Sequence, residues 1–167
     1  DSGASFGWPA VSTAGENSIM VIWSNPENIL FYSTWDFSQS SVPPPATCLK
    51  APDISGSTIN QFQPRLTGRA DGSYSAVFSI IETGEETIYE MEYFGEIWST
   101  PQSLGSGKTP EVFSDPEGLT YFTWCDSDGK VRIKDGNTEL VDIIDFPTCM
   151  SRPSMSLAEN GDFWIGN

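Results

Sequence analysis

One residue pattern recurs along the chain and constrains its fold more than any other feature. A proline is followed two residues later by Val or Leu, eight residues later by Gly or Asn, and fourteen residues later by Trp or Phe. Three complete copies begin at Pro9, Pro64 and Pro110, and a fourth, shorter copy begins at Pro153. The spacings are 55, 46 and 43 residues. Repeats of about 40 to 50 residues are typical of propeller blades or of paired helices.

Turn chemistry distinguishes between these two folds. Asp-Gly and Asn-Gly pairs favour tight hairpin turns, and here they separate short runs rich in β-branched and aromatic residues. No segment has the sustained 3.6-residue apolar period of an amphipathic helix. The chain is therefore predicted to be all-β. The turn pairs are Asp71-Gly72, Asp128-Gly129, Asp135-Gly136 and Asn160-Gly161.

Each complete copy has room for four strands. First strands are predicted at 10–13, 65–68, 111–114 and 154–157, and second strands at 18–23, 73–78, 119–124 and 162–167. Third strands are predicted at 28–35, 87–94 and 130–136, and fourth strands at 46–50, 96–104 and 139–144. Such a chain is predicted to be one domain over residues 1–167, a β-propeller of four-stranded antiparallel blades with about three and a half blades present. We expect Trp23, Phe78 and Trp124 to fill the gaps between adjacent blades.

The fourth copy has only two predicted strands, at 154–157 and 162–167. An open apolar strand edge tends to pair with another chain. Two explanations fit. The sequence is a fragment of a longer propeller, or strands are shared between subunits. The expected partners are therefore additional blades from another chain or further copies of this chain in a homo-oligomer.

A segment of the second copy, GEIWSTPQSL at residues 95–104, matches the late part of a known repeat type. This segment and the spacing of the repeats together resemble the sialidase-like (BNR or Asp-box) β-propeller superfamily. The box of that family reads Ser-x-Asp-x-Gly-x-Thr-Trp. This chain retains its Gly and Trp, so the box is degenerate. The residues at the matching places are Met91, Tyr93, Gly95, Ile97 and Trp98.

Propellers of this kind bind ligands at one mouth of the central channel. The loops before the first strands meet there with the loops between second and third strands. The resemblance implies a ligand site that contains Trp8, Arg65, Glu111 and Arg152. Acidic residues are expected to surround it: Glu27, Glu82, Glu85, Glu86, Glu111, Asp126 and Asp128.

Sialidase catalysis would require three arginines that bind a carboxylate, a Tyr–Glu nucleophile pair and an acid Asp. Only Arg65 and Arg152 are expected at the ligand-binding mouth, because Arg69 follows a first strand and Arg132 lies within a third strand. The Phe-Arg-Ile-Pro signature of the family is absent. This incomplete catalytic set favours a binding protein over an enzyme.

The charge of the chain excludes several classes of partner. The formal net charge is −15, with 8 Lys and Arg against 23 Asp and Glu, and there is no histidine. Such a surface repels nucleic acid and anionic membranes, and no apolar run is long enough to insert into a bilayer.

The lack of histidine removes the commonest acid–base group at neutral pH. No cofactor is expected.

Two further features concern metal and cysteine. The sequence DSDG at residues 126–129 resembles the opening of a calcium loop, so calcium could bind Asp126 and Asp128, although a simple hairpin turn explains the same residues. Cys125 and Cys149 are expected at one mouth of the propeller and form the most plausible disulfide, which leaves Cys48 over.

The leading hypothesis is a non-catalytic carbohydrate-binding or adhesive propeller module, extracellular or on a cell or virion surface. Its ligand would be a glycan, because sugars pair an apolar ring face with hydroxyl groups. One alternative is part of a sialidase-like glycoside hydrolase. Another is a structural subunit that assembles into rings, fibres or virion appendages by strand sharing.

Overall fold

The fold consists of β-strands in every described element. The computed structural model describes residues 9–24, 29–38, 47–49, 58–59, 64–82, 84–136, 141–144, 149, 152–158 and 162–166. Within these ranges the chain is all-β and its strands form four antiparallel sheets, as the sequence predicts for the fold class. Trp8 lies outside the described residues. No helix in the described ranges could cross a membrane.

The first and third sheets each contain four strands in sequential order. Each sheet is a chain of hairpins, so consecutive strands are antiparallel neighbours. The first sheet comprises β1 (Ala10–Ala14), β2 (Ser18–Ser24), β3 (Leu30–Asp36) and β4 (Thr47–Leu49). The third comprises β11 (Lys108–Ser114), β12 (Thr120–Cys125), β13 (Val131–Asp135) and β14 (Val141–Ile144).

The second sheet is larger because its central hairpin is extended at both edges. β5 and β6 both pair with β7, and β9 and β10 both pair with β8. The single fourth strand predicted at 96–104 is therefore wrong. The segment forms two short strands, interrupted around Pro101, which has no N–H to donate to a ladder. The strands are β5 (Thr58–Ile59), β6 (Arg65–Gly68), β7 (Tyr74–Glu82), β8 (Glu85–Phe94), β9 (Ile97–Trp98) and β10 (Gln102–Ser106).

The fourth sheet contains the hairpin of β15 (Ser154–Leu157) and β16 (Phe163–Gly166). In all four sheets the first hairpin has the same register. The fourth residue after the repeat proline always pairs with the tenth. These pairs are Thr13 with Ile19, Gly68 with Tyr74, Ser114 with Thr120, and Leu157 with Phe163. The repeat in the sequence is thus a repeat in the structure.

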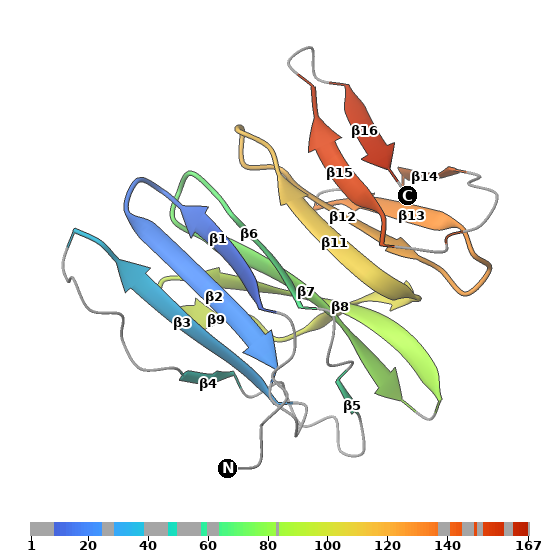
Figure 1. The fold of residues 1–167 in the computed structure, drawn as a ribbon, viewed down its shortest axis with the longest axis horizontal. Helices are drawn as coiled ribbons and strands as arrows, with labels where there is room; N and C mark the ends of the chain where they lie inside the picture. The colour runs from blue at the N-terminus through green and yellow to red at the C-terminus, as the bar shows by residue number, and fades with distance from the viewer. Residues whose placement is uncertain are drawn as a thin grey trace.

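The sheets pack face to face in chain order, with their first strands adjacent (Figure 1). β1 lies beside β6, β6 beside β11, and β11 beside β15. The approach of β6 to β1 is so close that a side chain at Gly68 would collide with the Thr13 carbonyl group and come within 2.7 Å of the Ala14 Cβ. The first and fourth sheets lie at opposite ends of the arrangement (Figure 1).

An apolar core separates each pair of neighbouring sheets. Phe78 packs between the first and second sheets and Trp124 between the second and third, with 0% and 2% of their surfaces exposed. The prediction that these aromatic residues fill gaps between sheets is confirmed. Trp23 differs. It is half-buried and stacks on Phe31 with ring centroids 6.0 Å apart, because no sheet in the described ranges covers its face.

Candidate binding cleft

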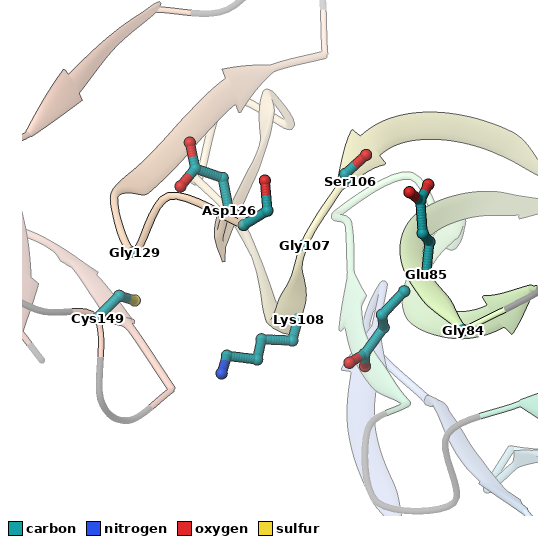
Figure 2. Close-up of a pocket in the computed structure, with 10 residues that line it drawn as sticks. Gly84, Glu85, Ser106, Gly107, Lys108, Asp126, Gly129 and Cys149 are labelled. Atoms are coloured by element: carbon teal, nitrogen blue, oxygen red, sulfur yellow. The ribbon is translucent and has the colours of Figure 1, made fainter.

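A cleft of about 670 Å³ opens between the second and third sheets (Figure 2). Three segments and one further residue form it: the β7–β8 turn, the crossing from β10 to β11, the β12–β13 turn, and Cys149. We call it the inter-sheet cleft. Its lining residues are Gly84, Glu85, Glu86, Ser106, Gly107, Lys108, Asp126, Ser127, Gly129 and Cys149.

The crossing from β10 to β11 is held on both sides. The Gly107 amide donates a hydrogen bond to the Glu86 carbonyl oxygen at 2.8 Å, and the Trp124 indole Nε1 donates to the Ser106 carbonyl oxygen at 3.2 Å. Gly107 has a φ of 150°, and a Cβ there would lie 2.5 Å from Trp124 Cδ1 and collide with the Cys125 carbonyl oxygen. Only glycine fits this crossing.

An unusual backbone conformation follows immediately. Thr109 has a φ of 56°, in the left-handed region that β-branched residues rarely occupy. Its Oγ1 donates a hydrogen bond to the Lys108 carbonyl oxygen at 2.7 Å, and Pro110 follows it. Backbone strain of this kind tends to occur at functional sites. Here it determines how the chain leaves Lys108, whose side chain reaches the cleft.

One wall of the cleft is built around the Asp126 carboxylate, which is buried. Its Oδ1 accepts hydrogen bonds from the Asp128 and Lys130 amides, both at 2.9 Å, and its Oδ2 accepts one from Arg132 Nε at 2.7 Å. Burial is the largest single influence on the Asp126 pKa and raises it. The hydrogen bonds from Lys130, Arg132 and Asp128 and the charge of Arg132 together outweigh burial, so the pKa lies below its usual value of 3.8.

A disulfide closes the same wall. It joins Cys125 at the end of β12 to Cys149, the pair expected from the sequence, with Cα atoms 5.7 Å apart. The Cys149 amide also donates to the Gly129 carbonyl oxygen at 3.0 Å. The two bonds hold Cys149 against the β12–β13 turn. Cys48 lies in β4, and its side chain is outside the described part of the structure.

The exposed lining residues are those that could contact a ligand. Glu85, Ser106, Lys108 and Ser127 are exposed, whereas Gly107, Asp126 and Cys149 are buried. Figure 2 shows Asp126 and Cys149 on one side of the cleft and Ser106 and Glu85 on the other, with Lys108 between them. Glu86 is half-buried, and its Oε1 accepts a hydrogen bond from Ser79 Oγ at 2.6 Å.

Three of the residues predicted to bind the ligand lie outside this cleft, and Trp8 lies outside the described residues. Arg65 on β6 and Glu111 on β11 meet in an ion pair, with Nε 3.2 Å from Oε2 and 19% and 24% of the side chains exposed. Burial raises the Glu111 pKa above 4.5 despite the attraction of Arg65. Neither residue lines the inter-sheet cleft, and neither does Arg152, which precedes β15.

The carboxylates predicted around the mouth are brought together in part. Glu85, Glu86 and Asp126 line the cleft, while Asp128 is exposed in the adjacent turn. The sequence interpretation did not include Ser106, Gly107 and Lys108. A signal was available, because Gly105 and Gly107 alternate with polar residues just before Pro110.

Among the described residues, no group of three or more His, Cys, Asp or Glu side chains could hold a metal ion. Calcium binding at Asp126 and Asp128 stays a prediction, and the Asp126 oxygens already accept three protein hydrogen bonds.

No protein-family model matches the chain, and no curated protein sequence matches it significantly.

Proposed function

We propose that the four sheets are successive blades of a β-propeller and that the chain is a non-catalytic module that binds carbohydrate in the inter-sheet cleft. The shared hairpin register and the adjacent first strands support the propeller part. The distant relationship to sialidase-like propellers belongs to the same proposal. It rests on residues 95–104, in which Trp98 packs edge-on against Tyr32 of the first sheet at 5.6 Å.

One observation carries the binding part of the proposal. The exposed groups of Glu85, from β8, and Lys108, from β11, face a cleft whose buried walls are held by hydrogen bonds and a disulfide. Sugar hydroxyl groups both donate and accept hydrogen bonds. A carboxylate, an ammonium group and the hydroxyls of Ser106 and Ser127 are suitable partners for them, and rigid surroundings reduce the entropic cost of binding.

The electrostatics favour a neutral glycan. A chain with a net charge of −15 repels polyanionic sugars at long range.

Glycoside hydrolysis in most families uses a pair of carboxyl groups on either side of the scissile bond. In the cleft both Asp126 oxygens and Glu86 Oε1 accept protein hydrogen bonds. Glu85 is then the one exposed carboxylate among the described lining residues, which supports binding without hydrolysis.

The disulfide supports an extracellular location or one on a cell or virion surface. Disulfides form and persist in oxidising compartments and are rare in the cytosol. The Cys125–Cys149 bond and the acidic surface agree with that environment.

A glycan array probed with the purified chain, with calcium and with chelator, tests the proposal. We expect binding to neutral oligosaccharides in both conditions, because the Asp126 oxygens are occupied by protein donors. Absence of binding in both conditions would contradict the proposal. Incubation with fluorogenic sialosides and other glycosides tests the hydrolase alternative, and release of the fluorophore would establish it.

A further inference from the structure

The second strand of every sheet has two faces with different neighbours. In the second and third sheets, residues twelve and fourteen after the repeat proline face the preceding sheet. Examples are Phe78, packed against the first sheet, and Trp124, packed against the second. The alternate residues face the following sheet, as Met20 does beneath the second sheet. Each sheet therefore has a leading face and a trailing face.

The first sheet presents a leading face that no described sheet covers. Val11 occupies the second position after the proline, where Leu66 and Val112 are 8% and 6% exposed, yet Val11 is 60% exposed. The rest of the face is formed by equivalents of residues that are covered in the second and third sheets. The leading face consists of Val11, Thr13, Ile19, Val21 and Trp23.

The fourth sheet presents an uncovered trailing face. Trp164 is 66% exposed, whereas its equivalent in the first sheet, Met20, is fully buried. Ser154 and Ser156 are exposed on the same face of β15. The opposite face carries Ile165, which packs against the core between the third and fourth sheets. The trailing face consists of Ser154, Ser156 and Trp164.

Hydrogen bonds between neighbouring sheets follow a repeated rule. Ser12 Oγ accepts a bond from the Gly68 amide at 2.9 Å, and Thr67 Oγ1 accepts one from the Ser114 amide at 3.2 Å. In both cases the hydroxyl lies three residues after one proline and the amide four residues after the next. The third sheet has Phe113 at the hydroxyl position, so the rule is interrupted there.

The two uncovered faces carry the two groups that form this hydrogen bond, an accepting hydroxyl on one face and a donating amide on the other. Ser156 has the hydroxyl position on the trailing face, and Thr13 has the amide position on the leading face. Thr13 pairs with Ile19 in the register that Gly68 and Ser114 have in their own hairpins. Its amide therefore points away from β2, toward any sheet that covers the leading face. Ser114 shows that a side chain at this position is compatible with the bond.

We propose that the trailing face of one copy of this chain binds the leading face of a second copy, as the first sheet binds the second within one copy. Trp164 would cover Ile19 and Val21, and Ser156 Oγ would accept a hydrogen bond from the partner's Thr13 amide. The two faces differ, so the contact is heterologous. It extends from copy to copy, and it forms a ring where the rotation closes.

Sedimentation or light scattering of the purified chain over a range of concentrations tests the interface. We expect particles of at least twice the 18.3 kDa chain mass. Their fraction should rise with concentration and with salt, because each copy carries a net charge of −15 and salt screens the repulsion. A mass of 18.3 kDa in every condition overturns the proposal, and another segment would then cover these faces.

Two variants determine the polarity of the contact. Val11→Lys alters only the leading face and Trp164→Lys only the trailing face, and each alone should be monomeric. Mixed together, they should form a dimer that does not grow, because each contributes the one face that the other lacks. Ile97→Lys, at a 72% exposed residue outside both faces, is the matched control and should assemble as the wild type does. A mixture that stays monomeric overturns the head-to-tail contact, and so does assembly by either variant alone.

A measurement on the unaltered chain is independent of the variants. Hydrogen exchange of the peptide that contains Thr13 should slow as the concentration of the chain is raised, while the peptide that contains Ile97 should not change. Equal exchange at all concentrations, with a growing particle mass, would place the contact elsewhere and overturn the proposal.

Discussion

Arg65 of the second sheet and Glu111 of the third form an ion pair between two first strands, with Nε 3.2 Å from Oε2. Both side chains are mostly buried, and Arg65 also donates a hydrogen bond from Nη1 to the Pro64 carbonyl oxygen at 3.0 Å. Burial penalises the Glu111 carboxylate more than Arg65 favours it, which raises the pKa above 4.5. The pair belongs to the interface between the sheets.

The raised pKa gives the Glu111→Gln variant a defined pH dependence. The folded state holds the proton more tightly than the unfolded state, so ionisation of Glu111 lowers the free energy of unfolding as pH rises through the folded pKa. The wild type should therefore lose stability relative to Glu111→Gln as pH rises from below 4.5 toward neutrality. Urea unfolding at a series of pH values measures this. Glu117→Gln, at an exposed turn, is the control, and a wild-type advantage that grows with pH would contradict the expectation.

Asp126 has the opposite shift and should behave in the opposite way. Because the pKa of Asp126 is lowered in the folded state, the ionised carboxylate stabilises that state at pH values above 3.8. This contribution is lost as the pH falls through the folded pKa. Asp126→Asn should lower the free energy of unfolding at pH 7 by about 1–3 kcal/mol, because it weakens hydrogen bonds within a buried group. The difference from wild type should shrink in acid.

The neighbouring Asp128 is the matched control for that variant. It is exposed in the same turn, and Asp128→Asn should change stability by less than about 0.5 kcal/mol. Equal effects of the two substitutions in urea unfolding at pH 7 would show that the buried carboxylate has no special role in the turn.

Gly107→Ala should be costly because two effects coincide at one residue. The φ of 150° disfavours any side chain, and the new Cβ would collide with the Cys125 carbonyl oxygen. We expect a loss of more than about 3 kcal/mol, since strained backbone alone costs about 1–3 kcal/mol. Gly118→Ala separates the effects, because Gly118 has a φ of 88° with nothing within 4 Å of its Cβ position. Thermal unfolding that shows the same loss for both would contradict the close crossing.

Much of the fold could be predicted from the sequence because it depends on local chemistry. Proline position, Asp-Gly turns and runs of β-branched residues placed the first, second and third strands close to their observed bounds. The split into β9 and β10 was not predicted, although Pro101 could have indicated it. The exposure of Trp23 could not be predicted from a pattern that it shares with Phe78 and Trp124, because burial depends on whether another sheet is present.

The candidate site was harder to predict, since it depends on contacts between sheets. Glu85, Glu86 and Asp126 were expected near one mouth because their turns are equivalent in the repeat. Arg65 and Glu111 form an ion pair with each other, and their role in ligand binding stays a prediction. Lys108 was missed because its position depends on how β10 crosses directly to β11, which repeat spacing does not determine.

Glu85 and Lys108 supply the sharpest test of the cleft. Removal of a hydrogen bond to a charged group costs about 1.5–3 kcal/mol, which corresponds to roughly tenfold or more in Kd. Glu85→Gln and Lys108→Ala should each weaken glycan binding by about that factor. Both side chains are exposed, so the free energy of unfolding should be unchanged.

The measurement that tests the central claim most directly is calorimetric titration of a neutral oligosaccharide, selected on the array, into the wild type and two variants. The variants are Lys108→Ala and the control Glu117→Gln. Glu117 lies in the β11–β12 turn and does not line the cleft. The proposal predicts binding to wild type and Glu117→Gln with the same Kd, and roughly tenfold weaker binding to Lys108→Ala. The same Kd for all three proteins would contradict it.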